Sequence, residues 1–287
     1  MFAQPGAVFT TRTPRVVAAR RLQRRRDRDE TGRFLAEGPQ AVREALAAGV
    51  VVEVFGTADA LTRHAALFSA TTGGATASGA TASRPTARVS EVDDEALAAL
   101  TETVQPQGLV AVCTQRDVPL ADALRKAPQL IAVCADIRDP GNAGTVLRTA
   151  DAAGATAVIF AGDSVDPYNG KAVRASAGSL FHVDVVRSRS STAAVAALQD
   201  AGLRVLAADG YGESDLFERS DLSEPTAWLF GSEAHGLPDD LKHAADARVR
   251  VPILGGAESL NLAAAAAVCL YASAKAMQAK NALKESM

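Results

Sequence analysis

The chain has 287 residues but only three cysteines, which lie far apart in the sequence. Cys113, Cys134 and Cys269 form no CxxC pair and no disulfide framework, a pattern typical of a reducing cytosol. Two of them lie in apolar runs, "IAVCAD" and "AAVCLYA". We therefore expect a cytoplasmic protein in which these cysteines act as small buried hydrophobic side chains.

Long hydrophobic runs and a strong excess of one charge are also absent. The longest uncharged apolar run, 262–272, is about half as long as a membrane span, and the N-terminus lacks the apolar core of a secretory signal. The net charge is −3, so a nucleic-acid site must come from local clustering of charge. These features predict a soluble protein with no membrane partner.

The motifs of several common chemistries are missing as well. "ADIRDPGNAGT" lacks the G-x-G-x-x-G of a dinucleotide fold, and "GDSVDPYNGKA" lacks the spacing and the hydroxyl of a phosphate loop. No segment fits the G-x-S-x-G nucleophile elbow. The four histidines show no metal-ligand spacing, so we expect no metal site.

A cluster of arginines lies near the N-terminus. Residues 12–33 hold nine arginines and no lysine, diluted by three acidic residues. One interpretation is a solvated helix, because arginine outnumbers lysine throughout the chain. The other is a stripe that faces RNA phosphates through Arg20, Arg21, Arg24 and Arg25.

The first part of the chain is predicted to be a small α/β domain, 1–115. A helix over 38–48 that ends at Gly49 is followed by a β-branched strand over 50–55. A second alternation follows over 87–114. Residues 69–86 are rich in Ala, Gly, Thr and Ser, which predicts a flexible loop, and 116–128 are predicted to be a linker.

Residues 129–287 show a regular alternation of strands and helices. Strands are predicted at 129–136, 156–162, 181–186, 203–209, 226–231 and 247–253, and helices at 143–153, 170–178, 192–201, 238–245 and 259–281. Strands rich in Val, Ile and Ala that alternate with helices indicate a parallel sheet covered on both faces. The fold class is therefore α/β.

Three segments in this second part resemble a known family. "DPGNAGTVLRTADAAGA", "TAWLFGSEAHGLP" and "VRVPILGGAESLNLAAAAAVCLYA" occur in this order. Together they resemble the motifs of the SpoU family of RNA ribose 2′-O-methyltransferases, within the knotted methyltransferase superfamily. The resemblance is close over about 129–275. It is looser in the first domain, where "FLAEGPQAVREAL" is similar to the start of the family's RNA-substrate-binding domain.

The resemblance implies a deep trefoil knot in the C-terminal domain and a homodimer that packs through this knot region. It also implies S-adenosylmethionine as the cofactor. Glycines in tight turns let a flat ligand approach the backbone, Ser259 can cap the last helix, and Leu260 and Asn261 lie at its predicted start. The cofactor-binding residues implied by the resemblance are Gly231, Gly236, Val251, Ile253, Ser259 and Leu260.

Arg148 lies in a predicted amphipathic helix, where it could simply form an ion pair with Asp151. By resemblance, it reaches the reacting ribose and contacts RNA. It could lose a proton and act as a base, or stay charged and stabilise the developing alkoxide. Asn142 is expected to orient this turn as the N-cap of the helix. The other catalytic candidates are Glu233, Ser259 and Asn261.

The sequence thus predicts a ribose 2′-O-methyltransferase that acts on ribosomal RNA, with the 23S species as the expected partner. The arginine-rich composition and the separate N-terminal domain are similar to actinomycete antibiotic-resistance members of the family. Two alternatives stay open, which are a housekeeping rRNA or tRNA methyltransferase and a catalytically inactive RNA-binding protein.

Overall fold

The computed structural model describes residues 8–72 and 87–285. The chain forms two compact units. The first comprises Met1–Gln115 and Tyr168–Phe181, and the second comprises Arg116–Pro167 and His182–Met287. Each unit has its own sheet and its own hydrophobic core, as an independent domain requires.

The first unit is built on a four-stranded mixed sheet in the order β1-β4-β2-β3. Only β2 and β3 run parallel, and β4 is antiparallel to both of its neighbours. The elements are α1 (Pro14–Arg21), α2 (Arg25–Thr31), β1 (Arg33–Glu37), α3 (Pro39–Ala48), β2 (Val51–Gly56), α4 (Ala58–Arg63), α5 (Ala65–Thr72), β3 (Arg88–Glu91), α6 (Asp94–Leu100) and β4 (Leu109–Thr114).

Most of the elements predicted in this unit are present. Helix α3 ends at Gly49, whose φ of 71° is the left-handed conformation that glycine adopts without strain. The sequence reading missed β1, whose five residues directly precede the predicted helix. Of the predicted flexible loop, 69–72 form the end of α5, and 73–86 lie outside the described residues.

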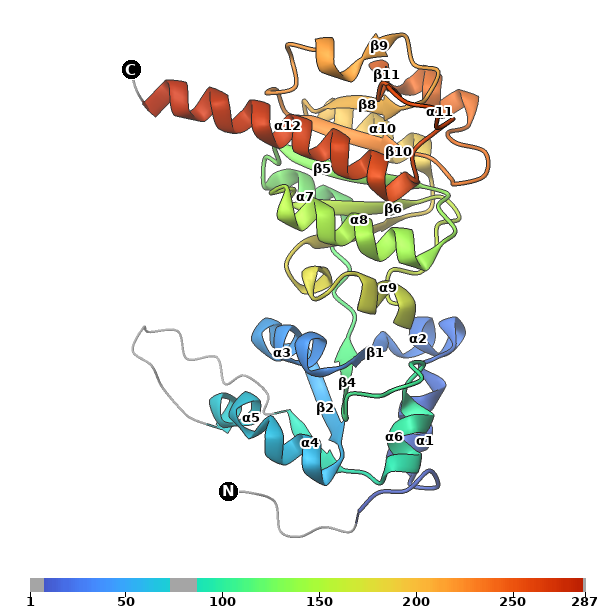
Figure 1. Ribbon diagram of the computed structural model, residues 1–287, viewed down its shortest axis with the longest axis vertical. Helices are drawn as coiled ribbons and strands as arrows, with labels where there is room; N and C mark the ends of the chain where they lie inside the picture. The colour runs from blue at the N-terminus through green and yellow to red at the C-terminus, as the bar shows by residue number, and fades with distance from the viewer. Residues whose placement is uncertain (1–7, 73–86, 286–287) are drawn as a thin grey trace. The chain divides into compact units, whose positions relative to one another are not determined.

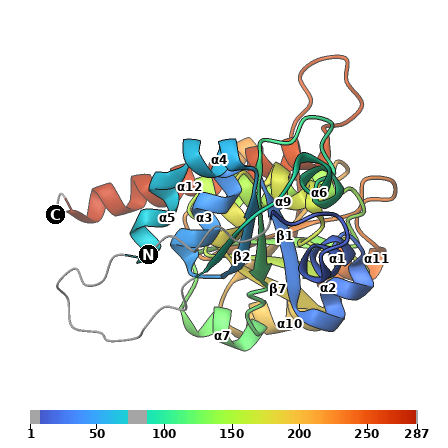
Figure 2. The same cartoon turned by 90° about the horizontal axis from the view of Figure 1, so that it is seen from below.

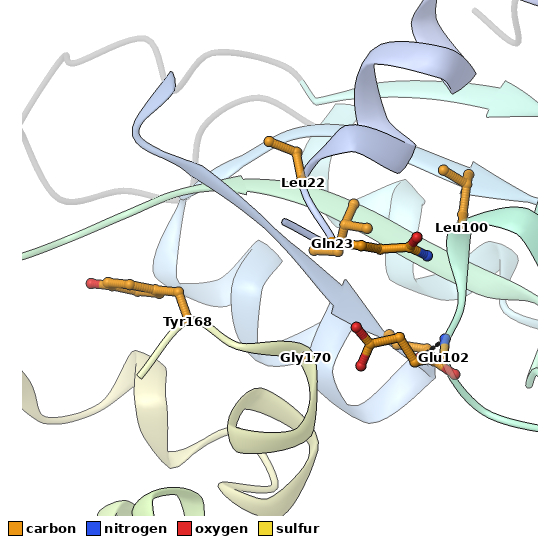
Figure 3. A pocket seen from close by; sticks show the side chains of 8 residues that line it. Leu22, Gln23, Leu100, Glu102, Tyr168 and Gly170 are labelled. Atoms are coloured by element: carbon orange, nitrogen blue, oxygen red, sulfur yellow. Dashed lines mark hydrogen bonds between the residues drawn. The ribbon is translucent and has the colours of Figure 1, made fainter. Parts of the chain in front are cut away.

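The segment Tyr168–Phe181 packs within the first unit although it is distant in sequence. Its helix α9 (Gly170–Ala175) places Arg174 beside Glu37 and Glu102, at 3.0 and 3.2 Å. The rings of Phe34 and Tyr168 have centroids 4.8 Å apart. Figure 3 shows the narrow crevice beside this segment, whose volume of about 10 Å³ leaves room for roughly one water molecule.

The second unit is built on a seven-stranded sheet in the order β7-β6-β5-β10-β8-β11-β9, in which every neighbouring pair is parallel. Its elements are α7 (Leu120–Arg125), β5 (Leu130–Ala135), α8 (Pro140–Ala152), β6 (Ala157–Ala161), β7 (Asp184–Ser188), α10 (Ser191–Asp200), β8 (Arg204–Ala208), β9 (Ser214–Asp215), β10 (Thr226–Phe230), α11 (Asp239–Ala244), β11 (Ala247–Arg250) and α12 (Leu262–Glu285).

The predicted parallel sheet is therefore confirmed, with local differences that include the edge strand β9, which was not predicted. Strand β7 begins at Asp184, three residues later than predicted, because Ser179–Phe181 form a 3₁₀ turn. Residues 116–128, which we expected to be a linker, contain helix α7, and the backbone N–H of Val118 donates to the carbonyl of Val185 on β7.

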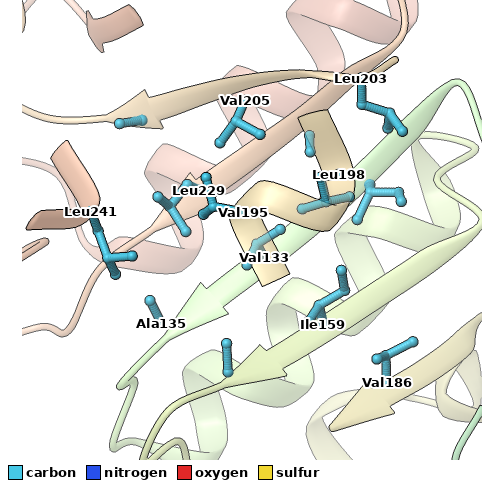
Figure 4. Close-up of a cluster of buried hydrophobic side chains, with 14 of the residues drawn as sticks. Val133, Ala135, Ile159, Val186, Val195, Leu198, Leu203, Val205, Leu229 and Leu241 are labelled. Atoms are coloured by element: carbon cyan, nitrogen blue, oxygen red, sulfur yellow. The ribbon is translucent and has the colours of Figure 1, made fainter. Parts of the chain in front are cut away.

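Helices cover both faces of this sheet (Figure 1). One face packs against α7, α10 and α11 through a buried cluster that includes Val133, Ile159 and Leu198 (Figure 4). Helices α8 and α12 lie side by side on the other face, where α12 contacts β10 and β5. The strands read as continuous apolar runs because both of their faces are buried.

Helix α12 begins at Leu262 and ends at Glu285, and its C-terminal part projects beyond the sheet (Figures 1 and 2). Within the described part of the chain, it is the one helix whose length and composition would allow it to cross a membrane. The core helix of a soluble protein passes the same test, and 28% of this window is buried. Its residues Ala266, Cys269 and Leu270 are fully buried.

The reactivity of the three cysteines can be used to test how tightly the two units are packed. Cys134 and Cys269 are buried, as predicted, and Cys113 is buried as well. Burial raises the pKa of each thiol, that of Cys269 to about 12. We expect no reaction with a thiolate-selective reagent at about pH 8 in the folded protein, and reaction of all three thiols in denaturant. Absorbance of the released chromophore measures both states. Fast labelling of any cysteine in the folded protein would contradict the packing.

Candidate active site

The loop that follows β10 makes a tight turn at the carboxyl end of the parallel sheet. The backbone N–H of Ser232 donates to Gly236 at 3.0 Å, and that of Gly236 donates back at 2.9 Å. A Cβ on Gly231 would lie 2.2 Å from the carbonyl carbon of Gly236. No residue with a side chain fits there, so this close approach explains the glycine.

A pocket of about 440 Å³ lies beside this loop. The loops after β8 and β11 and the start of α12 form its other walls. All six residues that the sequence analysis assigned to cofactor binding line it, namely Gly231, Gly236, Val251, Ile253, Ser259 and Leu260. The tertiary structure thus brings together residues from two loops that are distant in sequence.

The carboxylate of Glu233 joins this loop to the start of α8. Its Oε1 accepts hydrogen bonds from the backbone N–H of Asp139 at 3.1 Å and from Nδ2 of Asn142 at 2.9 Å. Its Oε2 accepts from the backbone N–H of Arg138 at 3.0 Å. Asn142 Oδ1 in turn accepts from Nδ2 of Asn261 at 3.2 Å. Three separate segments therefore meet in one hydrogen-bonded network.

These contacts also set the charge of Glu233. Partial burial acts to raise the pKa of its carboxyl, but the hydrogen bonds from Asn142 and from the Arg138 and Asp139 backbone outweigh burial and lower it. The group is therefore ionised at neutral pH and occupied by three donors. Such a carboxylate is well suited to hold loops together and poorly suited to take up a proton.

Two predicted caps are wrong. Asp139, rather than Asn142, caps α8, because its Oδ1 accepts the backbone N–H of Asn142 at 2.8 Å. Asn261, rather than Ser259, caps α12 by accepting the backbone N–H of Ala263 at 2.9 Å. Asn142 is therefore free to use its side chain toward Glu233. The sequence did carry the signal for Asp139, since it precedes Pro140 at the first helical position.

Arg148 lies apart from this network in its own chain. It is exposed, and six positions along α8 carry it about 9 Å beyond Asn142 and onto another face of the helix. The expected ion pair with Asp151 is absent, because Asp151 instead contacts Nδ1 of His182 at 2.8 Å. Arg148 makes no hydrogen bond or ion pair with any residue that the structure describes, so its guanidinium is available to a ligand.

The sequence analysis missed several residues around the site. Asp209, Gly210 and Glu258 also line the 440 Å³ pocket. A second pocket of about 620 Å³ also borders Glu233 and is lined by Asp136, Arg138 and His235, among others. Asp209 and Asp136 follow strand ends directly, and the carboxyl ends of parallel strands are where ligands bind in open α/β sheets. Within 8–72 and 87–285, no group of three His, Cys, Asp or Glu side chains could hold a metal ion.

The predicted RNA-binding arginines of the first unit fall into two pairs. Arg21 and Arg25 contact Asp27 and Asp29, at 2.7 and 3.7 Å. The side chains of Arg20 and Arg24 are exposed and contact no charged partner among the described residues. The stretch forms α1 and α2, which a turn over 22–24 separates.

The Glu233 network can be tested through the pocket it borders. Glu233→Gln turns an amide N–H toward backbone donors and removes the charge. A hydrogen bond to a charged group contributes about 1.5–3 kcal/mol, and the Glu233 carboxylate is exposed, so its loss should lie at the low end of this range. We therefore expect about tenfold weaker binding of S-adenosylmethionine. Calorimetry measures the affinity, and Glu218→Gln, on an exposed 3₁₀ turn, is the control.

The lowered pKa gives this test a pH dependence. The Glu233 contacts stabilise the folded loop fully above the ordinary pKa of the carboxyl. This stabilisation is lost as the pH falls through the lowered pKa of the folded state. Affinity of the wild type should therefore fall under acid conditions, while that of Glu233→Gln should depend less on pH. Equal affinities and equal pH profiles would show that the carboxylate does not shape the pocket.

The chain is similar to known RNA-modifying proteins over nearly all of its length. The model of the SpoU rRNA Methylase family matches residues 129–271, and that of the MRM3-like substrate binding domain matches 13–111. The chain is 34% identical to the 23S rRNA guanosine 2′-O-methyltransferase RlmP of Bacillus subtilis, covering 88% of this chain and 92% of the relative. It is also 40% identical to a 23S rRNA uridine 2′-O-methyltransferase of Streptomyces viridochromogenes, over 46% of this chain and 47% of the relative.

A solved structure agrees with this result. The AdoMet-bound rRNA methyltransferase of Sinorhizobium meliloti superposes with a TM-score of 0.77 at 32% identity, covering 94% of this chain and 98% of that one. The similarity therefore extends over both units and includes the three segments joined by Glu233. The chain belongs to the SpoU rRNA methylase family.

Proposed function

We propose that the protein transfers a methyl group from S-adenosylmethionine to a ribose 2′-hydroxyl of 23S rRNA in the cytoplasm. The observation that carries the proposal is the Glu233 network, which joins the three segments of the family resemblance by hydrogen bonds beside the 440 Å³ pocket. The test is transfer of a labelled methyl group to purified rRNA, followed by mapping of the modified nucleotide. Absence of transfer to any rRNA would overturn the proposal.

The pocket fits this cofactor. Its volume of about 440 Å³ lies in the range of small-molecule sites. Asp209, Glu233 and Glu258 line it, and no described Lys or Arg does, which suits a positively charged sulfonium. The tight turn at Gly231 and the chain around Val251 and Leu260 would hold the cofactor. When bound, S-adenosylmethionine supplies an electrophilic methyl group.

Arg148 is the proposed catalytic residue. Its exposure keeps the guanidinium in water, where an arginine stays protonated. This favours the charged form, which stabilises the developing alkoxide and contacts a phosphate, over the role of a base. Glu233 is a poor base because three donors occupy its carboxylate. Asn142, Ser259 and Asn261 complete the polar site.

We further propose a homodimer and a knotted C-terminal domain. Arg148 lies six positions along α8 from Asn142 and makes no contact with the Glu233 network of its own chain, so a complete site calls for residues of both chains. Helix α12 crosses back from the edge of the sheet to contact α8, as a threaded C-terminal chain would. Tyr271, on the same helix, is 52% exposed and available to an interface.

The comparisons support 23S rRNA as the substrate over tRNA. RlmP and the uridine 2′-O-methyltransferase of Streptomyces viridochromogenes both act on 23S rRNA, one on a guanosine and the other on a uridine. The retained Arg148, Glu233, Ser259 and Asn261 argue against an inactive RNA-binding protein. Protection against a ribosome-targeting antibiotic, as the sequence resemblance implies, would show as resistance in a host that expresses the gene. Housekeeping modification would leave sensitivity unchanged.

The proposed role of Arg148 predicts a large catalytic defect. Arg148→Ala should lower single-turnover methylation roughly 10²–10³-fold, the scale of removing one transition-state donor. Melting temperature and cofactor affinity should hold, because Arg148 is exposed and lies outside the pocket. Arg148→Lys keeps the charge and should recover part of the rate. Arg189→Ala is the control. Wild-type turnover by Arg148→Ala would show that Arg148 is not catalytic.

The two pairs of arginines in the first unit should differ in RNA binding. Replacing Arg20 and Arg24 with Gln should flatten the dependence of log affinity on log salt by about 0.7–0.9 per lost phosphate contact. Replacing Arg21 and Arg25 should change it less, because aspartates already neutralise them. Filter binding across a salt series measures both slopes. Equal slopes for wild type and the Arg20/Arg24 variant would show that the exposed arginines of α1 and α2 are solvated and do not contact RNA.

A further inference from the structure

Asp151 lies three positions after Arg148 on α8, one residue before the helix ends at Ala152. Side chains three positions apart are neighbours on a helix surface, so the carboxylate of Asp151 lies within reach of the Arg148 guanidinium. A carboxylate in the last turn of a helix also faces the partial negative charge of the helix C-terminus. A nearby cation or donor therefore stabilises Asp151, and Arg148 is the cation that its own helix offers.

The fold supplies a different donor. Nδ1 of His182 lies 2.8 Å from Oδ2 of Asp151, although the two residues are 31 positions apart in the sequence. An ionised carboxylate can only accept a hydrogen bond, so Nδ1 carries the proton and donates it. The side chains of His182 and Asp151 are 47% and 29% exposed, which places the contact partly out of the solvent.

The topology of the sheet explains why His182 reaches this carboxylate. Helix α8 ends shortly before β6, and β6 pairs in parallel with β7, with Ala157 opposite Asp184. The starts of both strands therefore lie at the same end of the sheet, next to the C-terminus of α8. His182 comes two residues before β7 and meets the last turn of this helix.

Arg148 departs from the behaviour of other helical arginines in this chain. Arg25, Arg26 and Arg125 each pair with an acidic side chain three or four positions away on the same helix. Arg148 is exposed and contacts no residue within 8–72 and 87–285 through a hydrogen bond or an ion pair. The structural difference is that His182 already holds the acidic neighbour of Arg148.

We propose that His182 is a positioning residue for the reaction, because its hydrogen bond keeps the carboxylate of Asp151 away from Arg148. An ion pair between Asp151 and Arg148 would have to break before the guanidinium could contact the ribose oxygen or a phosphate. The inference rests on the proposed function for the catalytic role of Arg148. Neither Asp151 nor His182 lines the 440 Å³ pocket, so cofactor affinity should not depend on this contact.

The first test is single-turnover methylation of 23S rRNA by the full-length protein. His182→Ala should lower the rate about two- to threefold, the scale of one helical ion pair that must break. Adding Asp151→Asn removes the competing charge, so the double variant should return to the wild-type rate. His182→Asn should also keep that rate, because its amide Nδ2 can replace Nδ1 as the donor. His243→Ala, an exposed histidine at the end of α11, is the control.

The second test measures the state of Arg148 without any methyl transfer. Phenylglyoxal attacks an arginine through its neutral guanidine, and a paired carboxylate favours the charged form and slows the attack. Labelling of Arg148 should therefore be about two- to threefold slower in His182→Ala than in wild type, again the scale of one helical ion pair. The double variant with Asp151→Asn should regain the wild-type rate. Peptide mass spectrometry follows the labelling, with the exposed Arg189 as the internal reference.

The double variant separates this role from a purely structural one. A folded His182→Ala that methylates and labels as wild type does, or a slow rate that Asp151→Asn does not restore, would overturn the inference. Thermal melting establishes that each variant is folded.

Failure of the inference and failure of the proposed function give different results. If wild type methylates rRNA and all variants behave as wild type does in both tests, only the role of His182 is wrong. If wild type methylates no rRNA, the proposed reaction fails, and the labelling of Arg148 still decides whether His182 keeps Asp151 away from it.

Discussion

The carboxylate of Glu233 accepts three hydrogen bonds from residues that lie 91 to 95 positions away in the sequence. Without these contacts, the loop after β10 would have no fixed relation to the start of α8. Through Asn142, the same network reaches Asn261 at the cap of α12. Because each donor is a backbone or amide N–H, the network needs an ionised acceptor, and the hydrogen bonds themselves keep the pKa of Glu233 low. The 440 Å³ pocket and the polar site thus share one electrostatic constraint.

The parallel sheet makes this network possible. Strands β5, β10 and β8 are neighbours with parallel register, so the loops that follow them emerge at one edge. Gly231 then turns the chain at a point where no Cβ fits. Helix α12 returns over the sheet and packs on α8, which brings the cap of one helix to the first turn of the other. The backbone topology and the side-chain network therefore depend on each other.

The arginines fall into two groups according to whether they contact an acidic side chain. Several arginines of α1 and α2 have acidic partners, and Arg28 is buried, where it donates to the carbonyls of Leu22 and Gln23. These side chains stabilise local structure. Arg20, Arg24 and Arg148 contact no acidic side chain among the described residues and are exposed. An exposed guanidinium without an acidic partner can bind a phosphate without first breaking an ion pair. The candidate RNA contacts are therefore the arginines that lack an acidic partner, and a high arginine content alone does not identify them.

The sequence by itself determined the parallel sheet and the burial of Cys134 and Cys269. Apolar runs of this length are buried on both faces, and glycine and loop signals mark the turns between them. Only the tertiary structure decided the role of Asn142, because its amide donates to Glu233, which lies 91 positions away in the sequence. It also decided the partner of Asp151, since His182 is 31 positions distant and competes with the local Arg148. The contacts of the buried Glu53 with Ser90 and Arg15 could not be foreseen either, because these partners lie on other elements. Local patterns specify elements and turns, whereas the partners of polar side chains depend on which distant segments the fold brings together.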